Sequence, residues 1–317
     1  MNSIAVVADV HINCRKYKEF ESSRFLQLIE HLTKQEIQTV IFAGDLFDHA
    51  RPSLEEIQLA QKGFKMLHKA NLDVLVLAGN HENISKTEST FDFLDLGIKY
   101  IEDTIIGTNS ISIRLLSWHK LKDHNTSVKS RAEILITHVR ANFGVVQEEY
   151  PVKDLSNEYE LVLLGDIHAR YSPYKNVHYT SSPYSTKFVQ STKGYGYIIL
   201  DLDTKDFKYI DLDLPCKVKA QCNYKDVKST IKAHSKHLLK LEVQGTLEEL
   251  SSLKEQDGVI FIKYAQESTV QLQAQHNQSI DTLNLLEPLV LSSELVQRYP
   301  DKHKDISKKI NELKGQL

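Results

Sequence analysis

The sequence has 317 residues, a formal net charge of −3 and 41% hydrophobic residues. This length accommodates one large domain with an appendage, or two domains. The sequence contains neither a stretch of roughly 20 apolar residues nor an N-terminal signal segment, so we expect a cytoplasmic protein with no membrane association. The cysteines Cys14, Cys216 and Cys222 form no Cys-x-x-Cys pair, which argues against a disulfide framework and a thiolate zinc site.

Three apolar runs in the first 80 residues predict strands that are covered on both faces: "SIAVVAD", "TVIFAGD" and "DVLVLAGN". Between the first two, "FESSRFLQLIEHLTKQ" has apolar residues at helical spacing. The stretch between the second and third opens with Ser53 and Glu56, which are spaced as in a helix capping box. Two later runs, "EILITHV" and "YELVLLGD", predict further strands. Alternating strands and helices indicate an α/β fold.

The pattern changes after about residue 190. "KGYGYIILDLDTKDFKYIDLDL" predicts two strands around a turn at Thr204 and Lys205, and Pro215 marks a plausible boundary. The following residues mix helix-like and strand-like stretches, which predicts a small α+β appendage. We therefore expect a main domain at 1–214, an appendage at 215–275, and a linker with a C-terminal helix at 276–317.

Every long apolar run ends in a side chain that can bind a metal ion. The carboxyl ends of strands in an α/β sheet meet at one edge, so these side chains are expected to converge. They are Asp9 and His11, Asp45 and Asp48, Asn80 with His81 and Glu82, His138, and Asp166 with His168. Carboxylate, amide and imidazole ligands suit Mn²⁺, Fe²⁺ or Zn²⁺, and the set exceeds what one ion needs. The sequence therefore predicts a site for two metal ions.

The order of these motifs resembles the calcineurin-like metallophosphoesterase superfamily. Within it, "GDLFDHARPS", "YTSSPYSTKF" and "KGYGYIILDLD" are similar to SbcD-type and meiotic-recombination-type DNA-repair nucleases. The resemblance covers residues 1–213, and the appendage resembles the family's capping domain more loosely. It implies a β-sandwich flanked by helices, a small capping domain and a C-terminal helical tail. The short chain is similar to compact bacteriophage-encoded members.

The resemblance also implies roles for individual residues. The first ion would be held by Asp9, His11, Asp45 and His168, and the second by Asp45, Asn80, His138 and Asp166. His81 would be the catalytic residue that protonates the leaving oxygen or stabilises the transition state. Asp48 and Glu82 are candidates to orient the ligands and His81, and His49 is a candidate substrate contact. His49 and three further histidines, His119, His124 and His178, are expected at the surface or in loops.

Two positions depart from the family pattern. Asp166 stands where the family usually has histidine, and this harder, more negative site should favour Mn²⁺ or, failing that, Mg²⁺. Glu82 stands where SbcD-like members usually have aspartate, and Gly-Asn-His-Glu is also the pattern of phosphoprotein phosphatases. Against that alternative, His49 and Ala50 stand where those phosphatases have Arg-Gly.

The resemblance implies a two-metal DNA nuclease subunit with 3′–5′ exonuclease and single-strand endonuclease activity. It would form a homodimer and act with an SbcC-type coiled-coil ATPase in DNA end processing, recombination and repair. The alternatives are a stand-alone phosphatase or small-substrate phosphodiesterase, and a non-catalytic DNA-tethering subunit. An apolar stripe in the tail, at Ile306, Ile310, Leu313 and Leu317, would either bind the ATPase or dock on its own domain.

Overall fold

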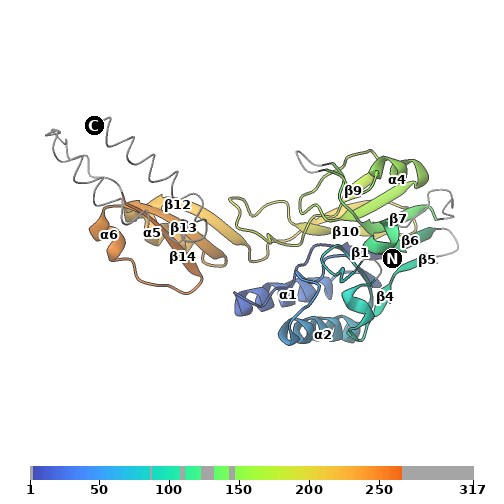
Figure 1. Cartoon of the computed structure of the whole chain (residues 1–317), viewed down its shortest axis with the longest axis horizontal. Coiled ribbons are helices and arrows are strands. Elements are labelled where there is room, and N and C mark those ends of the chain that lie inside the picture. Colours follow the sequence, from blue (N-terminus) through green and yellow to red (C-terminus); the bar gives the residue numbers. More distant parts are fainter. Residues whose placement is uncertain (1–2, 86–87, 108–110, 123–131, 143–146, 266–317) are drawn as a thin grey trace, which may run out of the picture. The chain divides into compact units, whose positions relative to one another are not determined.

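The computed structural model describes residues 3–85, 88–107, 111–122, 132–142 and 147–265. All of these except Ala265 belong to one compact unit, Met1–Tyr264. Within it, two β-sheets form a sandwich with helices on both outer faces, and a third, smaller sheet follows along the chain (Figure 1). This confirms the predicted α/β class and the predicted β-sandwich.

The first sheet has six strands in the order β11-β10-β1-β2-β3-β4. Its parallel part consists of β1 (Ser3–Val7), β2 (Thr39–Ala43), β3 (Asp73–Leu77) and β4 (Lys99–Ile101). Its antiparallel edge consists of β10 (Gly196–Asp201) and β11 (Phe207–Asp211), joined by the predicted turn, in which Lys205 has a positive φ of 64°. The residues of β1 are all buried, as their unbroken apolar run predicts.

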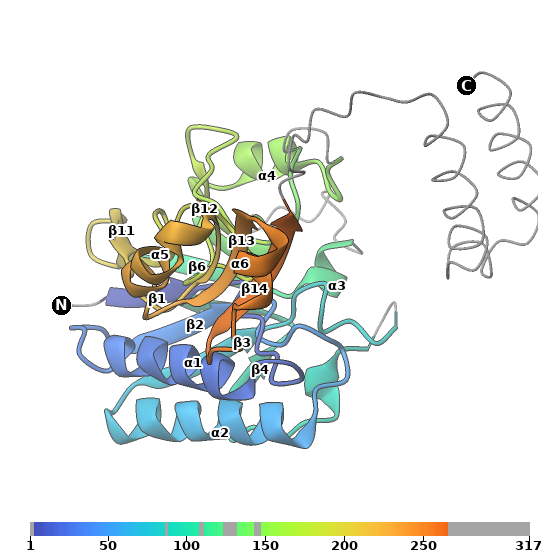
Figure 2. The ribbon, with the colours of Figure 1, turned by 90° about the vertical axis from the view of Figure 1, so that its left-hand side faces the viewer.

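Two helices, α1 (Lys18–Leu32) and α2 (Leu54–Lys69), lie side by side along the outer face of this sheet (Figure 2). Phe25, Leu28 and Leu32 of α1 are buried there. The capping box of α2 is confirmed, because Ser53 Oγ accepts from the Glu56 backbone N–H and the Glu56 carboxylate accepts from the Ser53 N–H. Glu56 also accepts a hydrogen bond from the Cys14 N–H at 2.8 Å, so this cap fixes the loop after β1 as well.

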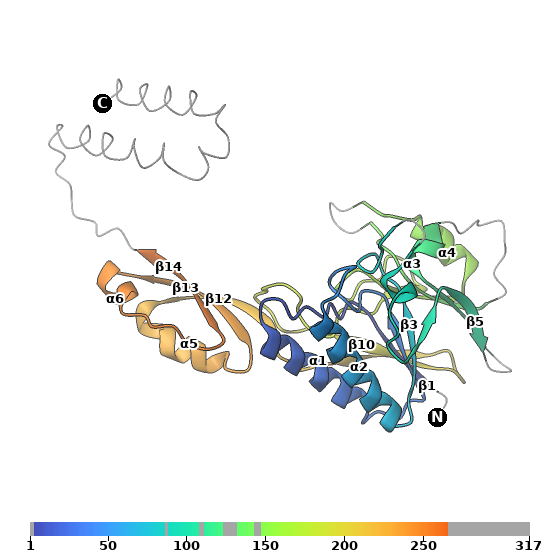
Figure 3. The ribbon, with the colours of Figure 1, turned by 60° about the horizontal axis from the view of Figure 1, so that its bottom comes forward.

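The second sheet has five strands in the order β5-β6-β7-β8-β9. They are β5 (Asp103–Gly107), β6 (Ser112–Leu116), β7 (Ile134–His138), β8 (Leu161–Gly165) and β9 (Val177–Tyr179). The pairs β6–β7, β7–β8 and β8–β9 are parallel. The helices α3 (Trp118–Lys122) and α4 (Val152–Glu158) pack against this sheet (Figure 3).

The sandwich has three apolar layers. Side chains such as Val6, Ile41, Ile136 and Leu163 fill the space between the two sheets. Separate clusters lie under α1 and α2 and under α3 and α4. Because both sheets are covered on both faces, polar groups are accommodated where the strands end, and this is where the conspicuous polar residues lie.

The appended sheet has the strand order β12-β13-β14. It consists of β12 (Lys217–Asn223), α5 (Val227–Ala233), β13 (Leu238–Gly245), α6 (Leu247–Ser251) and β14 (Val259–Ala265). The predicted helix-like and strand-like stretches correspond to these elements, whereas β12 was not anticipated. Its Lys217 forms an ion pair with Glu21 of α1 at 2.8 Å.

The domain limits 1–214, 215–275 and 276–317 stay predictions, and the predicted tail stripe lies outside the described residues. Within the described part of the chain, no helix is long and apolar enough to cross a membrane.

Candidate metal centre

The predicted ligands lie at the carboxyl ends of five strands of the sandwich or in the loops that follow them. Asp9, Asp45 and Asn80 follow β1, β2 and β3 of the first sheet, while His138 ends β7 and Asp166 follows β8 of the second. The loops after β1 and β2 are joined by hydrogen bonds from Asp9 N to Gly44 O, 3.1 Å, and from His11 N to Asp45 O, 2.9 Å. The two sheets therefore bring their carboxyl ends to one place, as predicted.

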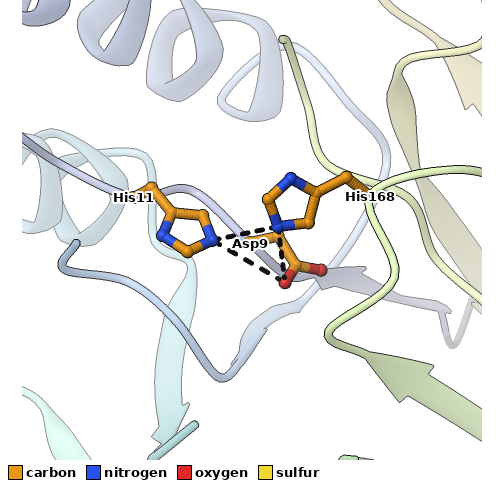
Figure 4. Close-up of side chains that lie close together, drawn as sticks. All are labelled: Asp9, His11 and His168. Carbon is orange, nitrogen blue, oxygen red and sulfur yellow. Dashed lines mark hydrogen bonds and ion pairs between the residues drawn. The ribbon is translucent and has the colours of Figure 1, made fainter. Parts of the chain in front are cut away.

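The first predicted ligand set gathers around the Nε2 atom of His11. Figure 4 shows Asp9, His11 and His168 directed toward a common point. His11 Nε2 lies 3.1 Å from His168 Nε2, 3.5 Å from Asp45 Oδ2 and 4.0 Å from Asp9 Oδ1. All four predicted residues are thus within the reach of one ion.

The second predicted set gathers around the Nε2 atom of His138. This atom lies 3.1 Å from Asn80 Oδ1, 3.4 Å from Asp45 Oδ2 and 3.9 Å from Asp166 Oδ1. The same Asp45 oxygen therefore faces both sets, while the other, Oδ1, accepts a hydrogen bond from the His81 N–H at 3.0 Å. Asp45 has the position that a bridging ligand requires.

In each of these histidines the ring nitrogen that faces away from the other ligands has a hydrogen-bond partner, and this arrangement suits cation binding. His138 Nδ1 donates to Ala43 O at 2.9 Å, so the other ring nitrogen, Nε2, faces the oxygens of Asn80 and Asp45. When the ring is neutral, Nε2 carries a lone pair, and a lone pair that faces oxygens needs a positive charge between them. In the same way, His11 Nδ1 contacts the Asp48 carboxylate at 3.1 Å and His168 Nδ1 contacts Thr186 Oγ1 at 2.9 Å. Such outer partners are typical of metal-binding histidines.

The electrostatics of the site also favour bound cations. Burial alone would lower the pKa of His138, but the carboxylates of Asp45 and Asp9 outweigh burial and raise that pKa well above its usual value. Burial alone would raise the pKa of Asp45, but the imidazoles of His138 and His11 outweigh burial and lower it. The buried carboxylates therefore stabilise positive charge, whether a proton or a metal ion supplies it.

Three glycines of the motifs are required by close packing around these ligands. A Cβ atom on Gly44 or Gly165 would lie 2.3 Å or 2.5 Å from His138 Nδ1, and one on Gly79 would lie 2.2 Å from Asp45 Oδ1. This is a physical reason for glycine before Asp45, Asn80 and Asp166.

Four predicted ligands have left-handed backbone conformations, with φ of 57° at Asp9, 49° at His11, 53° at Asp45 and 97° at Asp166. Such conformations cost on the order of 1–3 kcal/mol each and cluster at functional sites, where the surrounding structure holds them.

Asp48 and Glu82, the candidates to orient the ligands and His81, both form hydrogen bonds at the site. Asp48 accepts from the His11 ring through its carboxylate and from His81 Nδ1 through its backbone oxygen, at 2.8 Å. Glu82 is fully buried, and its carboxylate accepts from the backbone N–H groups of Asp45, Phe47 and Gly79 at 2.7 to 3.0 Å. Burial raises the pKa of Glu82 to about 7. Glu82 thus ties the loop after β2 to the loop after β3.

A cavity of about 760 Å³ opens over the ligands and is lined by His11, Asp45, His81, Asp166 and His168. The described lining does not include His49, which is 43% exposed and contacts Asp48 Oδ2 at 3.4 Å. The expectation for His119 was wrong, because this residue of α3 is buried and 3% exposed. His124 lies outside the described residues.

Several residues at the cavity were given no role from the sequence. Arg140, Thr186 and Lys217 line it and contact Asp166, His168 and Glu21 respectively, and Asn13 donates to Asp48 Oδ2 at 2.6 Å. Asn13 and Arg140 could have been noticed in the sequence, because each lies two residues after a predicted ligand, His11 and His138 respectively. Thr186 lay within "YTSSPYSTKF", a stretch noticed only as a resemblance.

The chain is similar in sequence to several known proteins. The chain is 24% identical over 262 residues to the DNA double-strand break repair protein Mre11 of Methanocaldococcus jannaschii, covering 73% of this chain and 71% of that one. It is 28% identical over 273 residues to the probable exonuclease subunit 1 of Escherichia phage T5, covering 79% and 81%. It is 22% identical over 252 residues to the SbcD subunit of the nuclease SbcCD of Staphylococcus saprophyticus, covering 63% and 65%.

The family model described as calcineurin-like phosphoesterase matches residues 3–190, which include every predicted ligand. The family uses two divalent metal ions, and the described residues of this chain include three overlapping groups that could hold a metal ion: Asp9, His11 and His168; His11, Asp45 and His81; and Asp9, Asp45 and His138. The chain therefore belongs to the calcineurin-like phosphoesterase family and is a metal-dependent hydrolase that acts on phosphodiester bonds.

Proposed function

We propose that this protein is the nuclease subunit of a DNA-processing assembly, with 3′–5′ exonuclease and single-strand endonuclease activity. The observation that carries the proposal is the position of Asp45 Oδ2, which lies 3.5 Å from His11 Nε2 and 3.4 Å from His138 Nε2. From this position the Asp45 carboxylate could bind two ions at once. The similarity to relatives named as a DNA double-strand break repair protein and an exonuclease subunit supports DNA as the substrate.

Two bound divalent cations would lower the pKa of an attacking water and neutralise the charge of the scissile phosphate. Asp9, His11, Asp45 and His168 would hold one of them, and Asp45, Asn80, His138 and Asp166 the other. We propose Mn²⁺, with Mg²⁺ as the alternative, because the ligands are carboxylate and amide oxygens with imidazole nitrogens and include no thiolate.

His81 would protonate the leaving oxygen or stabilise the transition state at the cavity. Its Nδ1 donates to Asp48 O at 2.8 Å, which fixes the ring, and the ring lies on the cavity wall with a 38% exposed side chain. The Nε2 atom, 3.9 Å from Asp45 Oδ2, is then the atom from which a proton would be delivered. Asp48 forms hydrogen bonds with both His11 and His81. It would therefore orient a metal ligand and the proton donor together.

Basic side chains at the cavity suit an extended anionic substrate. Arg140, Lys187 and Lys217 line the cavity beside the predicted ligands, and Arg140 and Lys217 are paired with Asp166 and Glu21. The exposed Lys187, together with bound cations, would attract a phosphodiester backbone, although the chain as a whole carries a net charge of −3.

We also propose partner proteins for this chain. Two relatives are named as subunits, which supports an assembly, and we propose an SbcC-type ATPase as the other component. A homodimer and a bacteriophage origin are further predictions from the resemblance.

The test is digestion of an end-labelled linear duplex, and of the same strand unpaired, by the purified chain with Mn²⁺, Mg²⁺ or EDTA. We expect metal-dependent shortening from the 3′ end, absent in Asp45→Asn. Turnover of p-nitrophenyl phosphate without cleavage of either DNA would overturn the proposal in favour of a phosphatase. DNA binding without any turnover would indicate a tethering subunit.

A second measurement separates DNA from small substrates. Lys187→Ala removes an exposed cation of the cavity wall that is not a predicted ligand. For a DNA substrate we expect weaker binding and a shallower salt dependence by about one counterion. Equal turnover of bis-p-nitrophenyl phosphate by both proteins would show that the ions are intact.

A further inference from the structure

Among the predicted ligands, Asp166 is the one that is held by an arginine. Arg140 Nε donates to Asp166 Oδ2 at 2.7 Å and Arg140 Nη2 donates to Asp166 Oδ1 at 2.9 Å. This is a two-point contact between a planar guanidinium and a carboxylate, and the Asp166 side chain is only 3% exposed. A buried carboxylate and its counter-charge therefore stand together at the edge of the second ligand set.

The backbone around Arg140 is fixed independently of Asp166. The Tyr179 hydroxyl donates to Val139 O at 2.8 Å and accepts from Ala141 N–H at 2.7 Å. The Glu149 N–H donates to Arg140 O at 2.9 Å. Because its neighbours are held on both sides, Arg140 approaches Asp166 from a prearranged position.

The contact leaves Asp166 able to bind an ion. A carboxylate has about four lone-pair sites, and the guanidinium occupies one on each oxygen. Asp166 Oδ1 also lies 3.9 Å from His138 Nε2, so it faces the second ligand set while it accepts from Arg140.

The contact with Arg140 changes the net charge of the second ligand set. Asp45 and Asp166 bring two negative charges, and Asn80 and His138 bring none when the imidazole is neutral. Arg140 contributes one positive charge at hydrogen-bond distance from Asp166. The second metal position therefore carries one net negative charge. The net charge would be the same if a neutral ligand replaced Asp166 and the arginine were absent.

We propose that Arg140 is a positioning residue that forms a charge-neutral unit with Asp166 and thereby sets the affinity of the second metal position. The inference rests on the proposed two-ion site and adds a residue to it. It implies that neutralising Asp166 alone is harmful chiefly because the Arg140 guanidinium then lies beside a divalent cation with only the more distant carboxylate of Glu149, 3.8 Å from Arg140 Nη1, to offset its charge. Neutralising both residues together should be tolerated, since an amide oxygen remains at the ligand position.

The experiment titrates the full chain with Mn²⁺ alone, by calorimetry, with electron paramagnetic resonance as an independent readout of paired ions. The proteins are the wild type, Asp166→Asn, Arg140→Gln and the double variant. Asparagine is suitable at 166 because it tolerates the left-handed backbone found there. Binding of the first ion, through Asp9, His11 and His168, serves as the control for folding.

We expect two ions in the wild type, with the second bound at least about 100-fold more weakly in Asp166→Asn. Arg140→Gln should bind the second ion at least as tightly as the wild type, because a repelling charge is gone. The double variant should return to within about tenfold of the wild type, and the paired-ion signal should return with it.

Two results would overturn the inference alone: a double variant no better than Asp166→Asn, or an Arg140→Gln variant as weak as Asp166→Asn. A wild type that binds a single ion would overturn the inference together with the two-ion site, and would leave DNA cleavage to be judged by the digestion experiment.

Discussion

The Nε2 atoms of His11 and His168 lie 3.1 Å apart, although the two histidines are 157 positions apart in the sequence. The outer nitrogen of each ring is engaged, with Asp48 for His11 and Thr186 for His168. Burial also lowers the pKa of His168, which keeps its imidazole neutral and its lone pair available. The pair therefore has the arrangement of two ligands to one ion.

This arrangement predicts graded effects on binding of the first ion. Thr186→Ala should weaken it about 10–100-fold, the usual cost of losing an outer partner, and His168→Ala should weaken it by more. Calorimetric titration with Mn²⁺ measures both, and the second ion is the internal control. Equal affinities in Thr186→Ala and the wild type would contradict the assignment of Thr186.

His81→Gln should separate catalysis from ion binding. His81 is 38% exposed on the cavity wall and its ring is held by Asp48 O, so we expect both ions to bind normally and kcat on DNA to fall about 10²–10⁴-fold. Turnover of bis-p-nitrophenyl phosphate should fall much less, because its leaving group needs no proton. An equal loss with both substrates would contradict a proton-donor role for His81.

Gly79→Ala should disrupt the centre by steric conflict. The added Cβ would lie 2.2 Å from Asp45 Oδ1 and 2.6 Å from the Asp45 nitrogen, so Asp45 must move. We expect destabilisation of about 1–3 kcal/mol in urea unfolding and loss of tight Mn²⁺ binding.

The matched control for that variant is Gly97→Ala. Gly97 has a φ of +68° and nothing within 4 Å of an added Cβ, so alanine there strains the backbone without touching the site. It should cost about 1–2 kcal/mol and leave ion binding unchanged. Normal ion binding in Gly79→Ala would contradict the close approach to Asp45.

Glu82 should make stability depend on pH in the metal-free protein. Burial raises its pKa to about 7 from an ordinary value of 4.5, so the folded state binds this proton more tightly than the unfolded state. The contribution of Glu82 to stability is therefore full below about pH 4.5 and is lost as the pH rises to about 7.

Glu82→Gln provides the comparison, since glutamine does not titrate and still fills the site. We expect it to be less stable than the wild type, because an amide cannot accept all three backbone hydrogen bonds, and the difference should shrink between about pH 5 and pH 7.5. Urea unfolding in EDTA measures it. A difference that grows with pH would contradict the raised pKa.

The positions of the polar groups along the chain could be predicted from the sequence alone. Apolar runs such as "SIAVVAD" and "TVIFAGD" are local patterns, and a run long enough to be covered on both faces must end where polar side chains can find partners. Asp9, Asp45 and Asn80 could therefore be placed at strand ends. The Ser53–Glu56 capping box was predictable for the same reason, since all its atoms lie within one turn.

Which of these groups meet, and what they meet, depends on the tertiary structure. The contact between Arg140 and Asp166 joins residues 26 positions apart, and the one between Thr186 and His168 joins the same loop after β8 to the segment after β9. That His119 is buried and that β12 brings Lys217 to the cavity likewise depend on the packing of distant elements. Local sequence sets strand period and strand ends, whereas the partner of a charged group is set by the packing of whole sheets, which involves residues far away along the chain.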